Sequence, residues 1–93
     1  MINEKKLKEI IKSLCYEVSL DREHCDDISH EIADQTSLIA KGISNNITSI
    51  PHMASVLRAS YEKYWCRKRD LWRICDMLGD EYLQIYNDIL GDS

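Results

Sequence analysis

The chain has 93 residues, of which 44% are hydrophobic and 30% charged, a balance that fits one globular domain over residues 1–93 and excludes a disordered chain. Its formal net charge of -4 argues against a general attraction to nucleic acid or to an anionic membrane. Three glycines and one proline are too few for the frequent turns of a sheet protein, so we expect an all-α fold.

The N-terminal sequence and the cysteines indicate in which cellular compartment we expect the protein. The segment MINEKKLKEII has no apolar run of signal-peptide length, and no stretch approaches the roughly 20 apolar residues of a membrane span. We therefore expect a cytoplasmic protein with no membrane partner, in which the four cysteines are reduced. Cys15 and Cys25 lie on either side of a predicted turn and can approach each other there.

Two amphipathic helices are predicted in the first part of the chain. The first spans about residues 3–19, with Asn3 as its N-cap and apolar residues at helical spacing. Leu20 and Asp21 are predicted to form a tight connection, after which Asp21 caps a second helix over about residues 22–41. Together these two elements predict a helical hairpin.

A loop over residues 42–49 precedes the second half of the predicted fold. Ser49 is expected to cap a long third helix over about residues 50–78, and Gly79 is expected to end it. A short fourth helix follows over about residues 81–90. Amphipathic helices with mostly short connections predict a small antiparallel bundle of about four helices, with the long third helix at its centre.

The predicted third helix is apolar over about half of its circumference, against the ~100° or more of an ordinary surface helix. Tyr61, Trp65 and Trp72 extend its core face sideways. Either the helix is the spine of the bundle, or these rings lie partly outside the core and meet a partner. The core face itself is predicted to consist of Met53, Val56, Leu57, Tyr64, Leu71, Ile74, Cys75 and Leu78.

Function is predicted from the partner-binding interpretation of this helix. Trp, Tyr and Arg are enriched at the energetic centres of protein interfaces. We therefore expect a small non-enzymatic protein of inhibitor, immunity, chaperone or adaptor type, which binds another protein or a second copy of itself. The candidate surface consists of Arg58, Tyr61, Trp65, Arg69, Trp72 and Arg73. A second candidate surface is the acidic face of Asp26, Asp27, His30, Glu31 and Asp34.

Two further basic residues, Arg67 and Lys68, project toward the apolar side of the same helix. An unpaired buried charge is costly, so each must reach water, pair with an acid or face an interface. Internal pairing is the favoured expectation. The acids expected to supply it are Asp26, Asp27, Glu31 and Asp34.

Nucleic acid is the alternative partner for residues 58–73. This segment carries six basic and two acidic side chains, so its net charge is +4. Aromatic rings stack on bases, and Arg and Lys hold phosphates. The acidic total charge and the absence of a nucleic-acid-binding motif make this the weaker of the two expectations.

Catalytic and metal chemistry are not predicted. Asp26, His30 and Asp34 recur every four residues and share one helix face, but a solvated polar face explains them without a metal. The cysteines lack the close pairs of a zinc site. Cys66 is the thiol most expected to be exposed, and no histidine is placed to activate it. We expect no enzyme activity, no cofactor and no bound metal.

Overall fold

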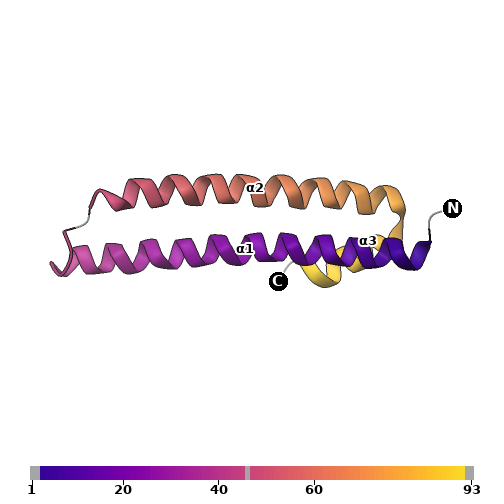
Figure 1. Ribbon diagram of the computed structural model, residues 1–93, viewed down its shortest axis with the longest axis horizontal. Helices are drawn as coiled ribbons and strands as arrows, with labels where there is room; N and C mark the ends of the chain where they lie inside the picture. Colours follow the sequence, from indigo (N-terminus) through magenta and orange to yellow (C-terminus); the bar gives the residue numbers. More distant parts are fainter. Residues whose placement is uncertain (1–2, 46, 92–93) are drawn as a thin grey trace.

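A computed structural model describes residues 3–45 and 47–91, and these form three α-helices without strands. They are α1 (Glu4–Ala40), α2 (Ser49–Leu78) and α3 (Asp80–Leu90). Helices α1 and α2 form a long antiparallel hairpin, and α3 folds back beside the end where α1 begins and α2 ends (Figure 1). The all-α prediction is confirmed, but the described chain has three helices rather than four, and α1, not the predicted third helix, is the longest.

The two helices predicted in the first part of the chain are one continuous helix. The connection predicted at Leu20 and Asp21 is wrong, and so is the capping role of Asp21. No glycine or proline interrupts the 37 residues of α1, so nothing in the local sequence breaks the helix. The apolar pattern was misleading because Asp21 places a charge where the stripe otherwise continues from Val18 to Cys25.

The helix ends follow local capping chemistry. Asn3 is confirmed as the N-cap of α1, because its Oδ1 accepts a hydrogen bond from the backbone N–H of Lys5 at 3.0 Å. The capping role predicted for Ser49 is wrong, because Ser49 is already helical and Thr48 precedes it as N-cap without a side-chain bond. Gly79, at φ 118°, ends α2 as predicted and reverses the chain into α3.

Helices α1 and α2 meet along a seam with the alternating three- and four-residue spacing of a coiled coil. Seam positions in α1, all buried or half-buried, are Leu7, Ile11, Leu14, Val18, Asp21, Cys25, Ile28, Ile32, Gln35 and Ile39. Those in α2 are Ile50, Met53, Leu57, Ser60, Tyr64, Arg67 and Leu71. The result is a rod of 62 × 19 × 18 Å with a radius of gyration of 18.0 Å, well above the ~12 Å expected of a compact chain of this length.

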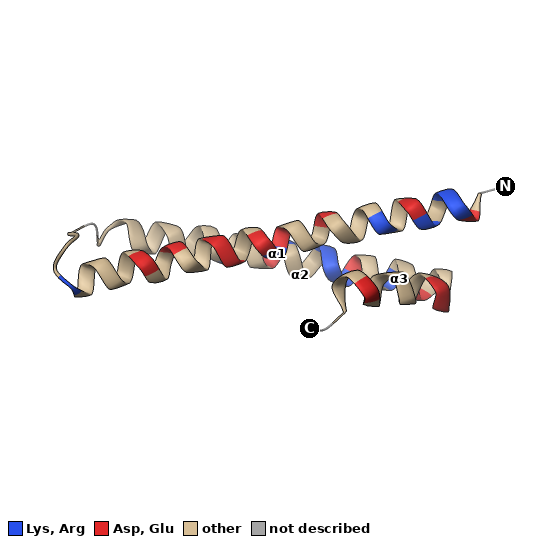
Figure 2. Ribbon diagram, turned by 90° about the horizontal axis from the view of Figure 1, so that it is seen from below, with Lys and Arg blue, Asp and Glu red and all other residues tan. Residues whose placement is uncertain are grey.

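The best-buried part of the core lies at the proximal end of the rod, where α3 covers the hairpin. Cys15 and Cys75 are completely buried, in the same core cluster as Tyr82 and Tyr86 of α3. Lys8 holds the start of α3 through an ion pair with Glu81 at 2.8 Å. The distal half of the hairpin, residues 22–40 and 49–66, consists of α1 and α2 alone over the residues that the structure describes (Figures 1 and 2).

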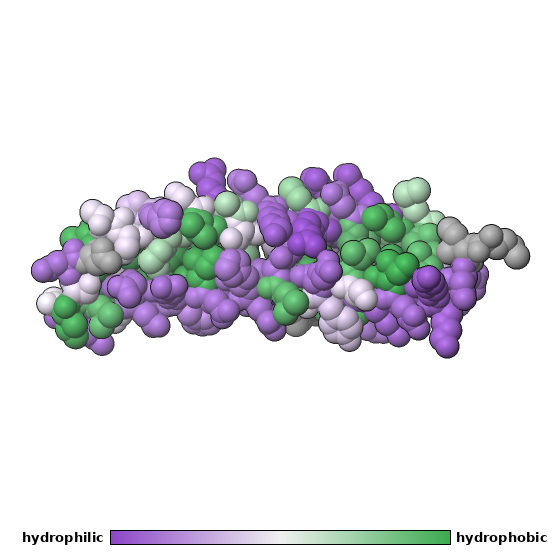
Figure 3. Space-filling view, viewed as in Figure 1, coloured by the Kyte–Doolittle hydropathy of each residue, from purple (hydrophilic) through white to green (hydrophobic). Residues whose placement is uncertain are grey.

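The predicted core face of α2 is only partly inside. Tyr64, Leu71 and Cys75 are buried, whereas Val56, Ile74 and Leu78 are exposed. A two-helix hairpin has room for only one narrow seam, so apolar residues beside the seam stay in contact with solvent. Figure 3 shows the consequence on one face of the rod, where apolar areas lie toward both ends with hydrophilic side chains between them.

No helix within the described residues has an apolar stretch long enough to cross a membrane.

Candidate protein-binding surface

Three aromatic rings of α2 lie on the outside of the hairpin. Tyr61 is 36% exposed, Trp65 is 59% exposed and Trp72 is 44% exposed. Trp65 follows Tyr61 by four residues and Trp72 follows Trp65 by seven, so all three stand on the same side of α2, beside the seam. The α2 segment therefore presents large rings to solvent in a row along the rod.

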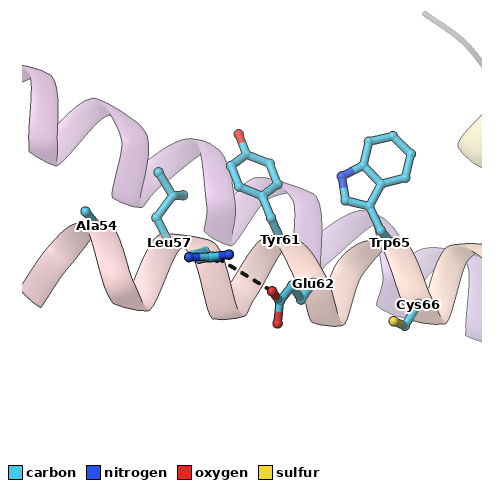
Figure 4. Close-up of a pocket in the computed structure, with 7 residues that line it drawn as sticks. Ala54, Leu57, Tyr61, Glu62, Trp65 and Cys66 are labelled. Atoms are coloured by element: carbon cyan, nitrogen blue, oxygen red, sulfur yellow. Dashed lines mark ion pairs between the residues drawn. The ribbon is translucent and has the colours of Figure 1, made fainter.

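The first two rings border an apolar hollow of about 610 Å³. Leu57, Tyr61 and Trp65 rise from the same side of α2, and Ala54 leaves the hollow low at one end (Figure 4). Arg58 stands at its edge. An open apolar hollow flanked by aromatic rings and a cation is suited to receive an apolar side chain of a partner.

A second hollow, of about 210 Å³, adjoins the first on the side of α3. It is lined by Trp65, Lys68, Arg69, Trp72 and Tyr86. Because Trp65 borders both hollows, the surface runs without a break from Ala54 to the last turns of α3.

Lys68 stabilises the orientation of the central ring. Its Nζ lies 5.3 Å from the centre of the Trp65 ring and 5.6 Å from the centre of the Tyr64 ring. The two rings meet edge to face, with their centres 5.3 Å apart. Cation–π and edge-to-face contacts of this kind favour one ring orientation. Trp65 is thus exposed but held in place.

Arg67 pairs inside the chain, with acids other than the expected ones. Its Nη1 donates to Asp21 Oδ2 at 2.9 Å, and its Nη2 donates to Glu17 Oε2 at 3.3 Å. The expectation that the acids of residues 26–34 neutralise Arg67 is wrong. The antiparallel register places Arg67 level with Asp21, so the acids of residues 26–34 lie farther along the rod. Lys68 faces aromatic rings instead of those acids.

The predicted arginines lie in three different settings. Arg58 is beside Glu62, with Nε and Oε1 3.8 Å apart, and lines the first hollow. Arg69 is beside Asp70 at 3.7 Å and lines the second. Arg73 is exposed and lines neither hollow. Of the candidate arginines, Arg58 and Arg69 therefore belong to the aromatic surface.

The acidic candidate surface is solvated along α1. Its members Asp26, Asp27, His30, Glu31 and Asp34 are all exposed. Acidic positions follow one another along the middle of α1, and some basic positions of α2 can be seen near the end covered by α3 (Figure 2). Within the described residues, no group of three or more His, Cys, Asp or Glu side chains is placed to hold a metal ion.

Three of the four thiols are sealed in the core. Burial raises the pKa of Cys15 to about 11, with a smaller contribution from Cys75. Burial also raises the pKa values of Cys25 and Cys75. Cys66 is exposed at the edge of the first hollow. Cys15 and Cys25 stand on one helix about 15 Å apart, so the approach expected across a turn does not occur.

Sequence reasoning missed the proximal apolar patch on another side of the hairpin. Ile10, Ile74 and Met77 are 48%, 45% and 86% exposed. A shallow groove lies between the helices nearby, with Leu14 and Ile74 among its lining residues. Ile74 belongs to the predicted core face of α2, but the narrow two-helix seam leaves it at the surface.

A search of protein-family models, curated proteins and solved structures found no match for this chain. Its function is therefore inferred from its own side chains.

Proposed function

We propose that this chain is a protein-binding module that docks through the aromatic surface of α2, as an inhibitor or an adaptor does. The observation that carries the proposal is the Trp65 ring, which is 59% exposed and borders two adjoining apolar hollows. Exposing a tryptophan ring and the apolar surface beside it to water is unfavourable, and burying both against a partner is favourable.

The energetic centre of this surface is expected at Tyr61, Trp65 and Trp72. Rings that are held in place lose little side-chain entropy on binding, and Lys68 already restrains Trp65. Arg58 and Arg69 stand at the rim, where exposed charges contribute to association rate and orientation more than to affinity.

Nucleic acid is less well supported as the partner of the same residues. Arg67 is committed to Asp21 and Glu17, while Arg58 and Arg69 each have an acidic neighbour within 4 Å. These carboxylates reduce the positive potential that phosphate binding needs. A protein partner, which can use the apolar rings directly, fits the surface better.

Affinity capture from the native cell, with nuclease treatment throughout, tests the proposal. The wild-type chain is expected to retain a defined protein, and Trp65→Ala and Trp72→Ala are expected to lose it. Met77→Ala is the matched control, because Met77 is 86% exposed on the same helix but lines neither aromatic hollow. Capture that is equal for wild type and Trp65→Ala, or that disappears with nuclease in every sample, contradicts the proposal.

A further inference from the structure

A second stripe of residues runs along α2 directly beside the seam with α1. Each member of this second stripe follows a seam residue by one position, so the stripe repeats the alternating three- and four-residue spacing of the seam. Consecutive members are Ala54, Arg58, Tyr61, Trp65, Lys68 and Trp72. Two adjacent stripes of this spacing suit a helix that packs against two other helices, of which α1 is one.

Helix α3 shows what packs on the second stripe where the stripe is covered. The member after Trp72 is Cys75, which is completely buried in one core cluster with Tyr82, Tyr86 and Leu90 of α3. These three residues of α3 follow one another at four-residue steps, so α3 packs as an amphipathic helix. At its proximal end, the second stripe therefore already belongs to a contact between helices.

The helix that covers this end is also acidic. Helix α3 carries Asp80, Glu81 and Asp88 and no basic residue. Glu81 pairs with Lys8 of α1 at 2.8 Å, and Lys8 Nζ lies 6.0 Å from the centre of the Tyr82 ring. The chain thus contains its own example of an acidic amphipathic helix that this side of the hairpin holds through apolar contacts and a lysine.

Toward the tip of the hairpin, the second stripe loses this cover. Trp72, Trp65 and Tyr61 are exposed, and the Arg58 side chain is 85% exposed. From Ala54 to Trp65 the stripe runs for about three helical turns, or about 16 Å, which is the length of an average α-helix. The described chain supplies no third helix over this stretch. The uncovered stretch therefore has room for one helix that ends before α3.

The charges at the uncovered stretch favour an acidic partner. The charged side chains that line the two aromatic hollows are three cations and one carboxylate, namely Arg58, Lys68, Arg69 and Glu62. On α1, Arg22 and Asp26 follow the buried Cys15 by seven and eleven residues, so they face the same side and add one charge of each sign. This surface is therefore positive, although the whole chain has a net charge of -4.

Lys68 repeats the setting of Lys8 without the acid. Its Nζ lies 5.3 Å from the centre of the Trp65 ring, as Lys8 Nζ lies near the Tyr82 ring. Lys8 pairs with Glu81, whereas Lys68 has no ion pair in the part of the chain that the structure describes. A carboxylate of a partner helix would supply the missing half of this arrangement.

We infer that the uncovered stretch of the second stripe binds an acidic amphipathic α-helix of another protein. The inference rests on the proposed function of the α2 surface in docking, and it names the chemistry of the partner. The apolar side of the partner helix covers Tyr61 and Trp65, and its carboxylates face Lys68, Arg58 and Arg69. Arg58 is available because its contact with Glu62 is 3.8 Å long and mostly in solvent.

Three designed peptides of about three heptads each, added to the full chain, test the inference. All carry leucine and tyrosine at alternating three- and four-residue steps and lack tryptophan, so Trp65 and Trp72 fluorescence reports binding. One peptide has glutamates beside the apolar positions, one has lysines there, and one has glutamates and two central prolines that prevent a helix. The glutamate helix is expected to bind about tenfold or more tightly than either of the others.

Variants of the chain locate the contact. Lys68→Glu is expected to weaken binding of the glutamate helix by about tenfold or more and to strengthen binding of the lysine helix, because the charge facing the peptide is reversed. Lys63→Glu is the matched control, since Lys63 is exposed on the same helix but lines neither aromatic hollow. Trp65→Ala is expected to abolish binding, with Trp72 as the remaining reporter. Circular dichroism checks that each variant is folded.

Several results would overturn the inference. They are no binding of the glutamate helix, equal or tighter binding of the lysine helix or the proline peptide, and equal effects of Lys68→Glu and Lys63→Glu. If the glutamate helix does not bind but the chain still captures a native protein through Trp65, only the acidic-helix inference fails. If that capture is absent as well, the proposed function fails with it.

Discussion

Arg67 and Asp21 form an ion pair across the two long helices, with Nη1 and Oδ2 2.9 Å apart, at seam positions where a coiled coil normally carries apolar side chains. The Asp21 side chain is 18% exposed and that of Arg67 is 38% exposed. Sliding one helix along the other would set Asp21 against an apolar seam residue without a partner, which is costly. The pair therefore favours one register of the hairpin, and that register positions the aromatic surface.

Removing one member of this pair is expected to destabilise the fold. In Asp21→Ala, Arg67 keeps only the 3.3 Å contact with Glu17, so the free energy of unfolding should fall by about 1–2 kcal/mol, between the values for exposed and buried pairs. Urea denaturation measures the change. Asp27→Ala, an exposed acid on the same helix, is the control and should differ from wild type by less than about 0.5 kcal/mol. Equal stability of Asp21→Ala and wild type would contradict the role of the pair.

The exposed ring of Trp65 is expected to contribute little to the stability of the isolated chain. Trp65→Ala should lower the free energy of unfolding by less than about 1 kcal/mol at high dilution, because the ring is mostly solvated. Leu71→Ala on the same helix should cost about 2–5 kcal/mol, because Leu71 is 4% exposed and its loss leaves a cavity. Denaturation of both variants at one low concentration makes the comparison. A Trp65→Ala loss as large as that of Leu71→Ala would place the ring in the core.

Thiol alkylation should separate one cysteine from the other three. Cys66 is exposed, whereas Cys15, Cys25 and Cys75 are completely buried and burial raises their pKa values. Because the thiolate is the reactive form, the native chain should gain one adduct rapidly near pH 8 and the other three only on unfolding. Intact-mass measurements over time, with a Cys66→Ser control that gains none rapidly, test this. Rapid addition of two or more adducts to the native wild type would show that the core is open.

Acid should weaken the attachment of α3. The hydrogen bond from Lys8 lowers the pKa of Glu81 from its ordinary 4.5, so the folded-state pKa lies below the unfolded value. The stability from this contact is therefore fully present above pH 4.5 and is lost as the pH falls through the folded-state pKa. The melting temperature of the wild type should fall more steeply than that of Glu81→Gln as the pH drops from 5 to 3. Parallel curves for the two proteins would show that the contact contributes nothing.

The helix content and most helix ends could be predicted from the sequence, because these features depend on local chemistry. Asn3 and Gly79 mark helix ends through capping and a left-handed backbone, and both were correctly identified. The continuity of α1 was missed at Asp21, since a charge on an apolar stripe resembles a turn until its partner Arg67, 46 residues away, is known. The exposure of Trp65 also depends on long-range packing. It follows from α3 covering only the proximal end of the hairpin, and no local sequence pattern shows how far along the hairpin a short helix extends.

Intrinsic fluorescence tests the exposure of the α2 surface most directly, because Trp65 and Trp72 are the only two tryptophans in the chain. At high dilution, the emission should lie close to that of tryptophan in water and should be quenched by iodide. Covering the surface with a bound partner should shift the emission to shorter wavelength and protect it from iodide. Emission at short wavelength that resists iodide at every dilution would contradict the account, because both rings would then be sealed inside a single chain.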